Sequence, residues 1–86
     1  MSTLMLPRLL SETVRVEPVQ EVSGTTVQDA LDDLLTRVPG LRAHILDEAA
    51  AIRPHVSVFV DGEQAELATE VGPTSEIRVL QAVSGG

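Results

Sequence analysis

Few residues of this 86-residue sequence could do chemistry, and they form no catalytic group that we can identify. The chain has no cysteine, which excludes a disulfide framework, a thiolate metal site and a cysteine nucleophile. His44 and His55 stand eleven residues apart without clustered partners, so we expect no metal site. Asp32 and Asp33 are adjacent and therefore diverge on a helix. A carboxylate pair for acid–base work needs a cleft, and a domain of this size offers little cleft.

The end of the chain, QAVSGG, is more informative. The α-carboxyl group of Gly86 is a carboxylate at neutral pH and becomes a good electrophile only when it is converted to an acyl adenylate. That conversion requires delivery of the group into the ATP site of another protein. Two terminal glycines lack Cβ atoms and can pass a narrow channel, and residues 82–86 span roughly 17 Å when extended at about 3.4 Å per residue. We therefore expect the chemistry at Gly86 and the threading tail at Val83, Ser84 and Gly85.

Composition and charge set the class of protein. The chain is 43% hydrophobic and 22% charged, as expected for an ordinary globular domain. Its net charge of −7 argues against nucleic acid, because phosphate contacts require a basic surface. The apolar start lacks the basic residues of a signal peptide, and no segment approaches the ~20 apolar residues that span a bilayer. We expect a cytoplasmic protein without a membrane or nucleic-acid partner, monomeric when free.

One segment predicts a long helix, over about residues 26–38. Its apolar residues recur at helical spacing, with polar residues between them. Thr26 is a natural N-cap, Asp29 supports it from the first turn, and Pro39-Gly40 ends the helix. The apolar stripe consists of Val27, Ala30, Leu31, Leu34, Leu35 and Val38. A shorter helical piece is expected within 41–46.

The remaining segments predict strands. We expect a strand over 3–6 and a second one around Val14, Val16 and Val22, paired as a hairpin through the connection RLLSE. After the helix, HVSVFVDGE alternates strictly and ends in a turn at Asp61-Gly62, then a weak strand and a final strand EIRVLQAV follow. This order predicts an α+β fold, a β-grasp or ubiquitin-like roll. A mixed sheet of about four to five strands would pack on the long helix, giving a domain of residues 1–82 and a tail of residues 83–86.

The whole chain resembles the MoaD/ThiS-like family of ubiquitin-fold sulfur carrier proteins. The matching segments are LMLPRLL, TTVQDALDDLL, VSVFVDGE and the ending SEIRVLQAVSGG. Gln81 departs from this pattern, because the family usually has proline at that position. Joined to the helix and the final strand at this spacing, the terminal Gly-Gly is a fairly specific feature.

The resemblance implies a carrier and not an enzyme. A partner similar to ubiquitin-activating enzymes would adenylate Gly86 with ATP, and a persulfide or sulfide donor would then displace AMP to leave a thiocarboxylate. A sulfur-accepting synthase would consume that sulfur, so ATP and the sulfur donor belong to the partners and the chain itself binds no cofactor. Leu80, Leu6 and Ala82 would lie on the exposed sheet face that docks the activating enzyme.

Two other functions fit the same residues. The activated Gly86 could form an isopeptide bond with lysines of target proteins, as a ubiquitin-like modifier does. The chain itself contains no lysine, so lysine-linked chains of this protein with itself are excluded. Alternatively the sheet could be a plain interaction module with an inert tail. The sequence does not indicate which pathway receives the sulfur: molybdopterin, thiamine, cysteine, thiolated tRNA and secondary metabolites all remain open.

Overall fold

A computed structural model of the chain describes residues 1–82, and the predicted tail at Val83, Ser84, Gly85 and Gly86 lies outside the described residues. Five strands form one mixed sheet in the order β2-β1-β5-β3-β4. β1 and β5 run parallel, whereas the other neighbouring strands run antiparallel. In chain order the elements are β1 (Ser2–Met5), α1 (Arg8–Val14), β2 (Val19–Val22), α2 (Val27–Arg37), the 3-10 turn η1 (Pro39–Leu41), α3 (Arg42–Ile45), β3 (Val56–Val60), β4 (Glu63–Ala65) and β5 (Glu76–Gln81).

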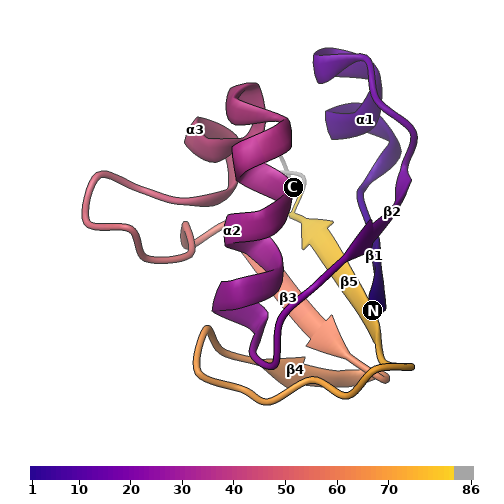
Figure 1. Cartoon of the computed structure of the whole chain (residues 1–86). Helices are drawn as coiled ribbons and strands as arrows, with labels where there is room; N and C mark the ends of the chain where they lie inside the picture. The colour runs from indigo at the N-terminus through magenta and orange to yellow at the C-terminus, as the bar shows by residue number, and fades with distance from the viewer. Residues whose placement is uncertain (83–86) are drawn as a thin grey trace.

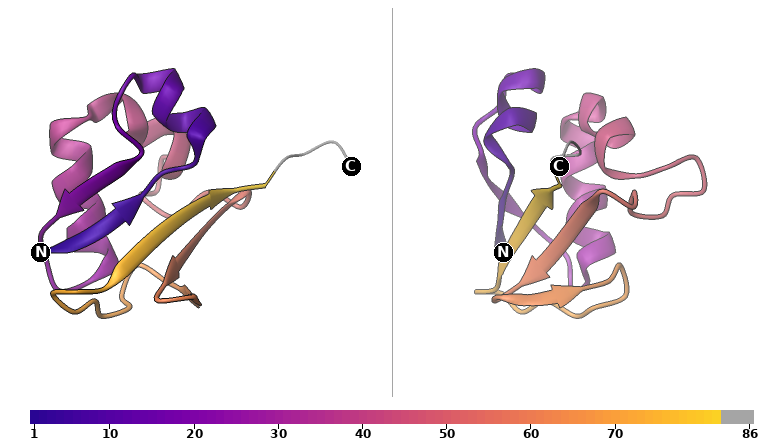
Figure 2. Two further views of the ribbon diagram at one scale, coloured as in Figure 1. Left: turned by 90° about the vertical axis from the view of Figure 1, so that its right-hand side faces the viewer. Right: turned by 180° about the vertical axis from the view of Figure 1, so that it is seen from behind.

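The helices lie on one side of the sheet and leave its other face uncovered (Figures 1 and 2). This is the predicted β-grasp arrangement, with one long helix and a short helical segment after it. Within residues 1–82, no helix has the length and apolar character that crossing a lipid bilayer requires.

The long helix α2 forms where its periodicity predicts it, and its first turn is fully capped. The Asp29 N–H donates to Oγ1 of Thr26 at 3.1 Å. The N–H groups of Val27 and Gln28 donate to backbone carbonyls of the 66–71 loop at 2.9 Å each. Since free N–H groups at a helix start must find partners, this loop fixes the helix on the sheet. Its predicted stripe is buried from Val27 to Leu35.

The core is aliphatic, as predicted. Val56 and Val58 of β3, together with Ile77 and Val79 of β5, are at most 5% exposed and face the helix. The predicted turn after β3 is also present: Asp61 has φ 50° and Gly62 has φ 87°. Two consecutive residues with positive φ between antiparallel strands are typical of a type I′ hairpin turn.

In the N-terminal third of the chain the structure differs from the prediction. The segment RLLSE, predicted as a hairpin connection, lies within helix α1, and the strand expected around Val14 and Val16 is absent. α1 ends at Arg15, whose φ of 58° is left-handed and whose N–H donates to the carbonyls of Ser11 and Glu12. This reversal turns both valines toward the core, where they are half-buried. β1 and β2 do pair antiparallel, but α1 joins them.

Candidate functional site

β5 carries the chain to the predicted tail, and it is the central strand of the sheet. It pairs with β3 from Val60–Ile77 to Val56–Gln81, and with β1 on its other side. Beyond the strand, the Ala82 N–H still donates to the carbonyl of His55 at 2.7 Å. The backbone is therefore held in place up to Ala82. The predicted chemical residues Gly86, Gly85, Ser84 and Val83 lie outside the described residues.

Alternation along β5 divides its side chains between two faces. Ile77 and Val79 point into the core, whereas Glu76, Arg78 and Leu80 point to the uncovered face. Leu80 is 43% exposed, which confirms the predicted exposure of this leucine. Ala82 is exposed as well. Their role in docking stays a prediction.

Leu6 lies elsewhere, and the prediction that it belongs to the exposed face is wrong. Its side chain is 6% exposed and is part of the core cluster. The cause is the two-residue period of the chain here: Ser2 and Leu4 are buried, Met5 is half-buried on the opposite face, and Leu6 continues the inward series.

Sequence reasoning missed Met5 and Val19 as members of this face. Strand register places one row of side chains across four strands: Val19 opposite Met5, Met5 beside Arg78, and Arg78 opposite Phe59. Val19 is 53% exposed, and Met5 and Phe59 are half-buried. The alternation of β1 could have revealed Met5. We call Met5, Val19, Phe59, Arg78 and Leu80 the outer face.

Arg78 places a cation in the middle of this apolar row. Its Nη2 lies 2.9 Å from Oε1 of Glu76 and 3.5 Å from Sδ of Met5. The ion pair is about half exposed on both sides, so it contributes little to stability. These two contacts place the guanidinium beside Met5 and Glu76. The outer face is thus an apolar surface that carries the Arg78–Glu76 ion pair.

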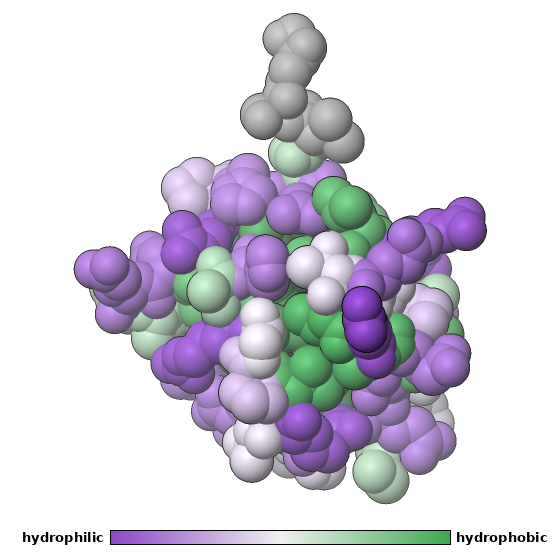
Figure 3. Space-filling model, turned by 90° about the horizontal axis from the view of Figure 1, so that it is seen from above, coloured by the Kyte–Doolittle hydropathy of each residue, from purple (hydrophilic) through white to green (hydrophobic). Residues whose placement is uncertain are grey.

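The described residues contain no other arrangement suited to catalysis. Across residues 1–82, His, Asp and Glu side chains form no group of three or more that could hold a metal ion. A groove of about 500 Å³ beside β3 has a floor that includes Ile52, Val58 and Leu67. Figure 3 views the end of the molecule formed by α1, α3 and the last turn of α2, where an apolar area is bordered by polar side chains. The groove and the apolar area are surfaces that can contact another molecule. The described residues offer no nucleophile paired with a base.

Comparison with known proteins shows the family to which this chain belongs. The model of the ThiS family matches residues 6–86 of the chain. The chain belongs to the ThiS family. It is homologous to small archaeal modifier protein 1 of Haloferax volcanii, with 35% identity over 77 residues that cover 88% of this chain and 84% of the relative.

Solved structures of other small proteins have the same fold. The chain superposes on one from the Amycolatopsis orientalis BexX/CysO complex with a TM-score of 0.89, 28% identity and complete coverage of both chains. It also matches CysO of Mycobacterium tuberculosis, described as an antigen, with a TM-score of 0.85 over 96% of this chain and 100% of the other. The identity in that pair is 21%, so it supports the fold alone.

Proposed function

We propose that this ThiS-family chain is a sulfur carrier whose reactive group is the α-carboxyl of Gly86. The observation that carries the proposal is the family match, which runs through the final Gly-Gly to residue 86. The similarity to a chain of the BexX/CysO complex, at 28% identity, supports the same proposal. The described structure supports it further, because β5 leads from the outer face directly to the tail.

The proposed cycle has three steps: adenylation of the carboxylate, replacement of AMP by sulfur, and transfer of the sulfur. A ubiquitin-activating-type enzyme joins the Gly86 carboxylate to the α-phosphate of ATP, which releases pyrophosphate. Hydrosulfide then attacks the acyl carbon, the bond to the AMP oxygen breaks, and AMP leaves with the electron pair. The product is a thiocarboxylate. On a sulfur-accepting enzyme the thiocarboxylate sulfur displaces a leaving group from an electrophilic substrate. Water then cleaves the acyl–sulfur bond, which restores the Gly86 carboxylate and leaves the sulfur on the product. ATP and the sulfur source are substrates of the partners.

The outer face is the docking surface in this proposal. Its apolar side chains can be covered by a partner, and interface energy concentrates in such central, well-packed groups. Leu80 stands two residues before Ala82, so a partner that covers Leu80 lies close to the start of the tail. The existence of a solved BexX/CysO complex supports the idea that a relative of this chain engages a partner protein.

Leu80→Glu tests the docking surface. We expect it to raise the carrier concentration needed for half-maximal ATP–pyrophosphate exchange by the host's adenylating enzyme at least about tenfold, the equivalent of about 1.4 kcal/mol. Leu9→Glu is the matched control: Leu9 is 66% exposed on α1, outside the outer face. An equal effect of both variants, or of neither, would contradict the assignment.

A second function has one specific observation in its favour: the homologue from Haloferax volcanii is named a modifier. In that case the activated Gly86 would form an isopeptide bond with a lysine of a target protein. Mass spectrometry of the protein from its own host distinguishes the two functions. Arg78 is the last tryptic site of the chain, so both products carry the segment from Val79 to Gly86.

The carrier predicts an oxygen-to-sulfur mass increase on the free peptide 79–86. The modifier predicts that this peptide is attached to lysines of other proteins. If neither form is found, and deletion of Gly85 and Gly86 leaves the host's phenotype unchanged, both functions are wrong and only an interaction module remains.

A further inference from the structure

The outer edge of β2 carries backbone groups that point out of the sheet. Within residues 1–82, β2 pairs with β1 and with no other strand. The Leu6 N–H donates to the carbonyl of Pro18 at 2.7 Å. In an antiparallel pair, hydrogen-bonded residues alternate. Residues 18, 20 and 22 therefore face β1, whereas Val19 and Glu21 direct their N–H and C=O groups away from it. Such a free edge can pair with another strand.

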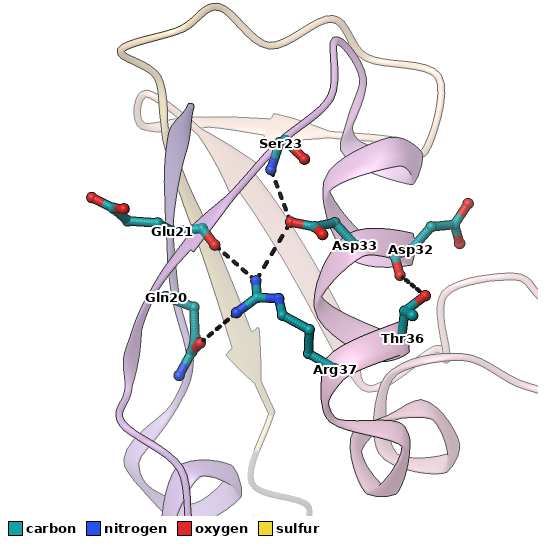
Figure 4. Close-up of polar contacts among 7 residues, drawn as sticks. All are labelled: Gln20, Glu21, Ser23, Asp32, Asp33, Thr36 and Arg37. Atoms are coloured by element: carbon teal, nitrogen blue, oxygen red, sulfur yellow. Dashed lines mark hydrogen bonds and ion pairs between the residues drawn. The ribbon is translucent and has the colours of Figure 1, made fainter.

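Two side chains of α2 close part of this edge (Figure 4). Nη2 of Arg37 donates to the carbonyl of Glu21 at 2.7 Å, and its Nη1 lies 3.4 Å from Oε1 of Gln20. One turn earlier, Oδ2 of Asp33 accepts from the Ser23 N–H at 3.0 Å. Asp33 and Arg37 also contact each other at 3.5 Å. One acceptor and one donor of the edge are thus occupied by a helix and not by a strand.

The opposite edge of the sheet, formed by β4, has fewer outward-facing backbone groups. β4 has three residues, and the two-residue turn at Asp61-Gly62 makes Val60–Glu63 a hydrogen-bonded pair. Glu63 and Ala65 therefore face β3, and only Gln64 directs its backbone outward. Of these two edges, only β2 has two residues, Val19 and Glu21, whose backbone groups face outward and can form a new ladder.

We propose that the outer edge of β2 is a strand-pairing surface for β2 of a second copy of this chain, and that Asp33 and Arg37 hold it closed. A two-fold axis through Gln20 places Val19 opposite Glu21 of the second copy. Each Val19–Glu21 pair then exchanges both backbone hydrogen bonds, and the two Gln20 amides meet at the axis. This register leaves no glutamate opposite another glutamate. It requires the Glu21 carbonyl, which is the acceptor that Arg37 occupies.

The second copy is the occupant that the edge itself favours. β2 supplies matched donors and acceptors to an identical antiparallel strand, and Val19, 53% exposed, gains cover from the aliphatic stem of Glu21 opposite. The net charge of −7 opposes such pairing at low ionic strength. A charge-assisted bond from Arg37 adds a local barrier, because pairing must first break it.

Arg37→Met tests the lock, since methionine keeps an unbranched apolar stem and removes the guanidinium. Arg42→Met on α3 is the matched control, because it changes the net charge equally and Arg42 makes none of the described contacts to β2. Sedimentation equilibrium at moderate salt and millimolar protein is the measurement. The wild type and Arg42→Met stay at the monomer mass of 9.2 kDa. The apparent mass of Arg37→Met rises with protein concentration toward twice the monomer mass.

Glu21→Pro identifies the surface. Proline removes the Glu21 N–H, which points outward, so an edge strand can accept it. The double variant Arg37→Met/Glu21→Pro returns to a monomer if strand pairing causes the association. Asp33→Asn, which weakens the second contact, associates less than Arg37→Met. Circular dichroism confirms that each variant is folded. A monomeric Arg37→Met, an equally associating Arg42→Met, or a double variant that remains dimeric overturns the proposal.

Discussion

Leu34→Ala, compared with Leu80→Ala, tests which of these two leucines belongs to the core and which to the outer face. Leu34 lies in the middle of α2 and is 0% exposed, surrounded by the core cluster. Truncation leaves a cavity that the neighbouring helix and strands fill only in part. Buried Leu→Ala changes cost about 2–5 kcal/mol, and a fully enclosed site belongs in the middle of that range, at about 3 kcal/mol.

This loss is large for a domain of this size. At about 0.05–0.15 kcal/mol per residue, the 86-residue chain has a free energy of unfolding of about 4–13 kcal/mol. With a urea m-value of about 1 kcal/mol/M, the unfolding midpoint should fall by about 3 M at unchanged m. Equilibrium urea unfolding followed by circular dichroism at 222 nm measures this shift, at about pH 7 and 25 °C.

Leu80→Ala is the matched control, with identical chemistry at a different depth. Leu80 already exposes 43% of its surface, so its truncation removes less buried area and leaves no enclosed cavity. We expect a loss below about 1 kcal/mol. Equal midpoint shifts for the two variants would refute the assignment of Leu34 to the core and Leu80 to the surface. A larger shift for Leu80→Ala would also show that Leu80→Glu cannot be used as a docking variant.

Two further predictions concern the start of α2. Gly24 has φ 126°, and a Cβ there would overlap the Cβ of Asp29, so Gly24→Ala should cost about 2 kcal/mol or more in urea unfolding. At Gly62 the φ is also positive but no atom lies within 4 Å of the new Cβ, so Gly62→Ala should cost clearly less. Thr26→Ala removes the N-cap and should lower the free energy of unfolding by about 1 kcal/mol. Thr36→Ala, whose hydroxyl donates back to the carbonyl of Asp32 within the helix, should be nearly neutral (Figure 4), and equal losses for both threonines would contradict the capping role.

The sequence was sufficient for the elements with long or strict periodicity. α2, β3 and β5 repeat their apolar residues over many positions, so each additional residue reinforces the same pattern. α1 is only seven residues long, and its last valine forms an apparent alternation with Val16 across Arg15. That alternation imitates a strand, whereas the left-handed Arg15 reverses the chain there. A single backbone angle of this kind leaves no periodic signal.

The candidate site was predictable only in part, for a similar reason. Alternation within one strand gives the exposure of Leu80, but the outer face is a row across four strands. Its members lie far apart in the chain; Met5 and Arg78, for example, are separated by 73 positions. Strand register brings them together, and register depends on the whole sheet. The same limit applies to Asp33 and Arg37, whose partners on β2 and at Ser23 directly after it lie ten to seventeen residues away.

The place of β5 in the sheet has a mechanical consequence. β5 is bonded to β3 from Ile77 to Gln81 on one side, and to β1 from Glu76 to Arg78 on the other. A force applied at Ala82 along the strand axis loads the hydrogen bonds of both ladders in shear, so they share the load and do not open one at a time. Traction on the C-terminal end of β5 therefore loads the sheet in shear and does not peel one strand from its edge. The fold can withstand traction at the point where a partner would take hold of it.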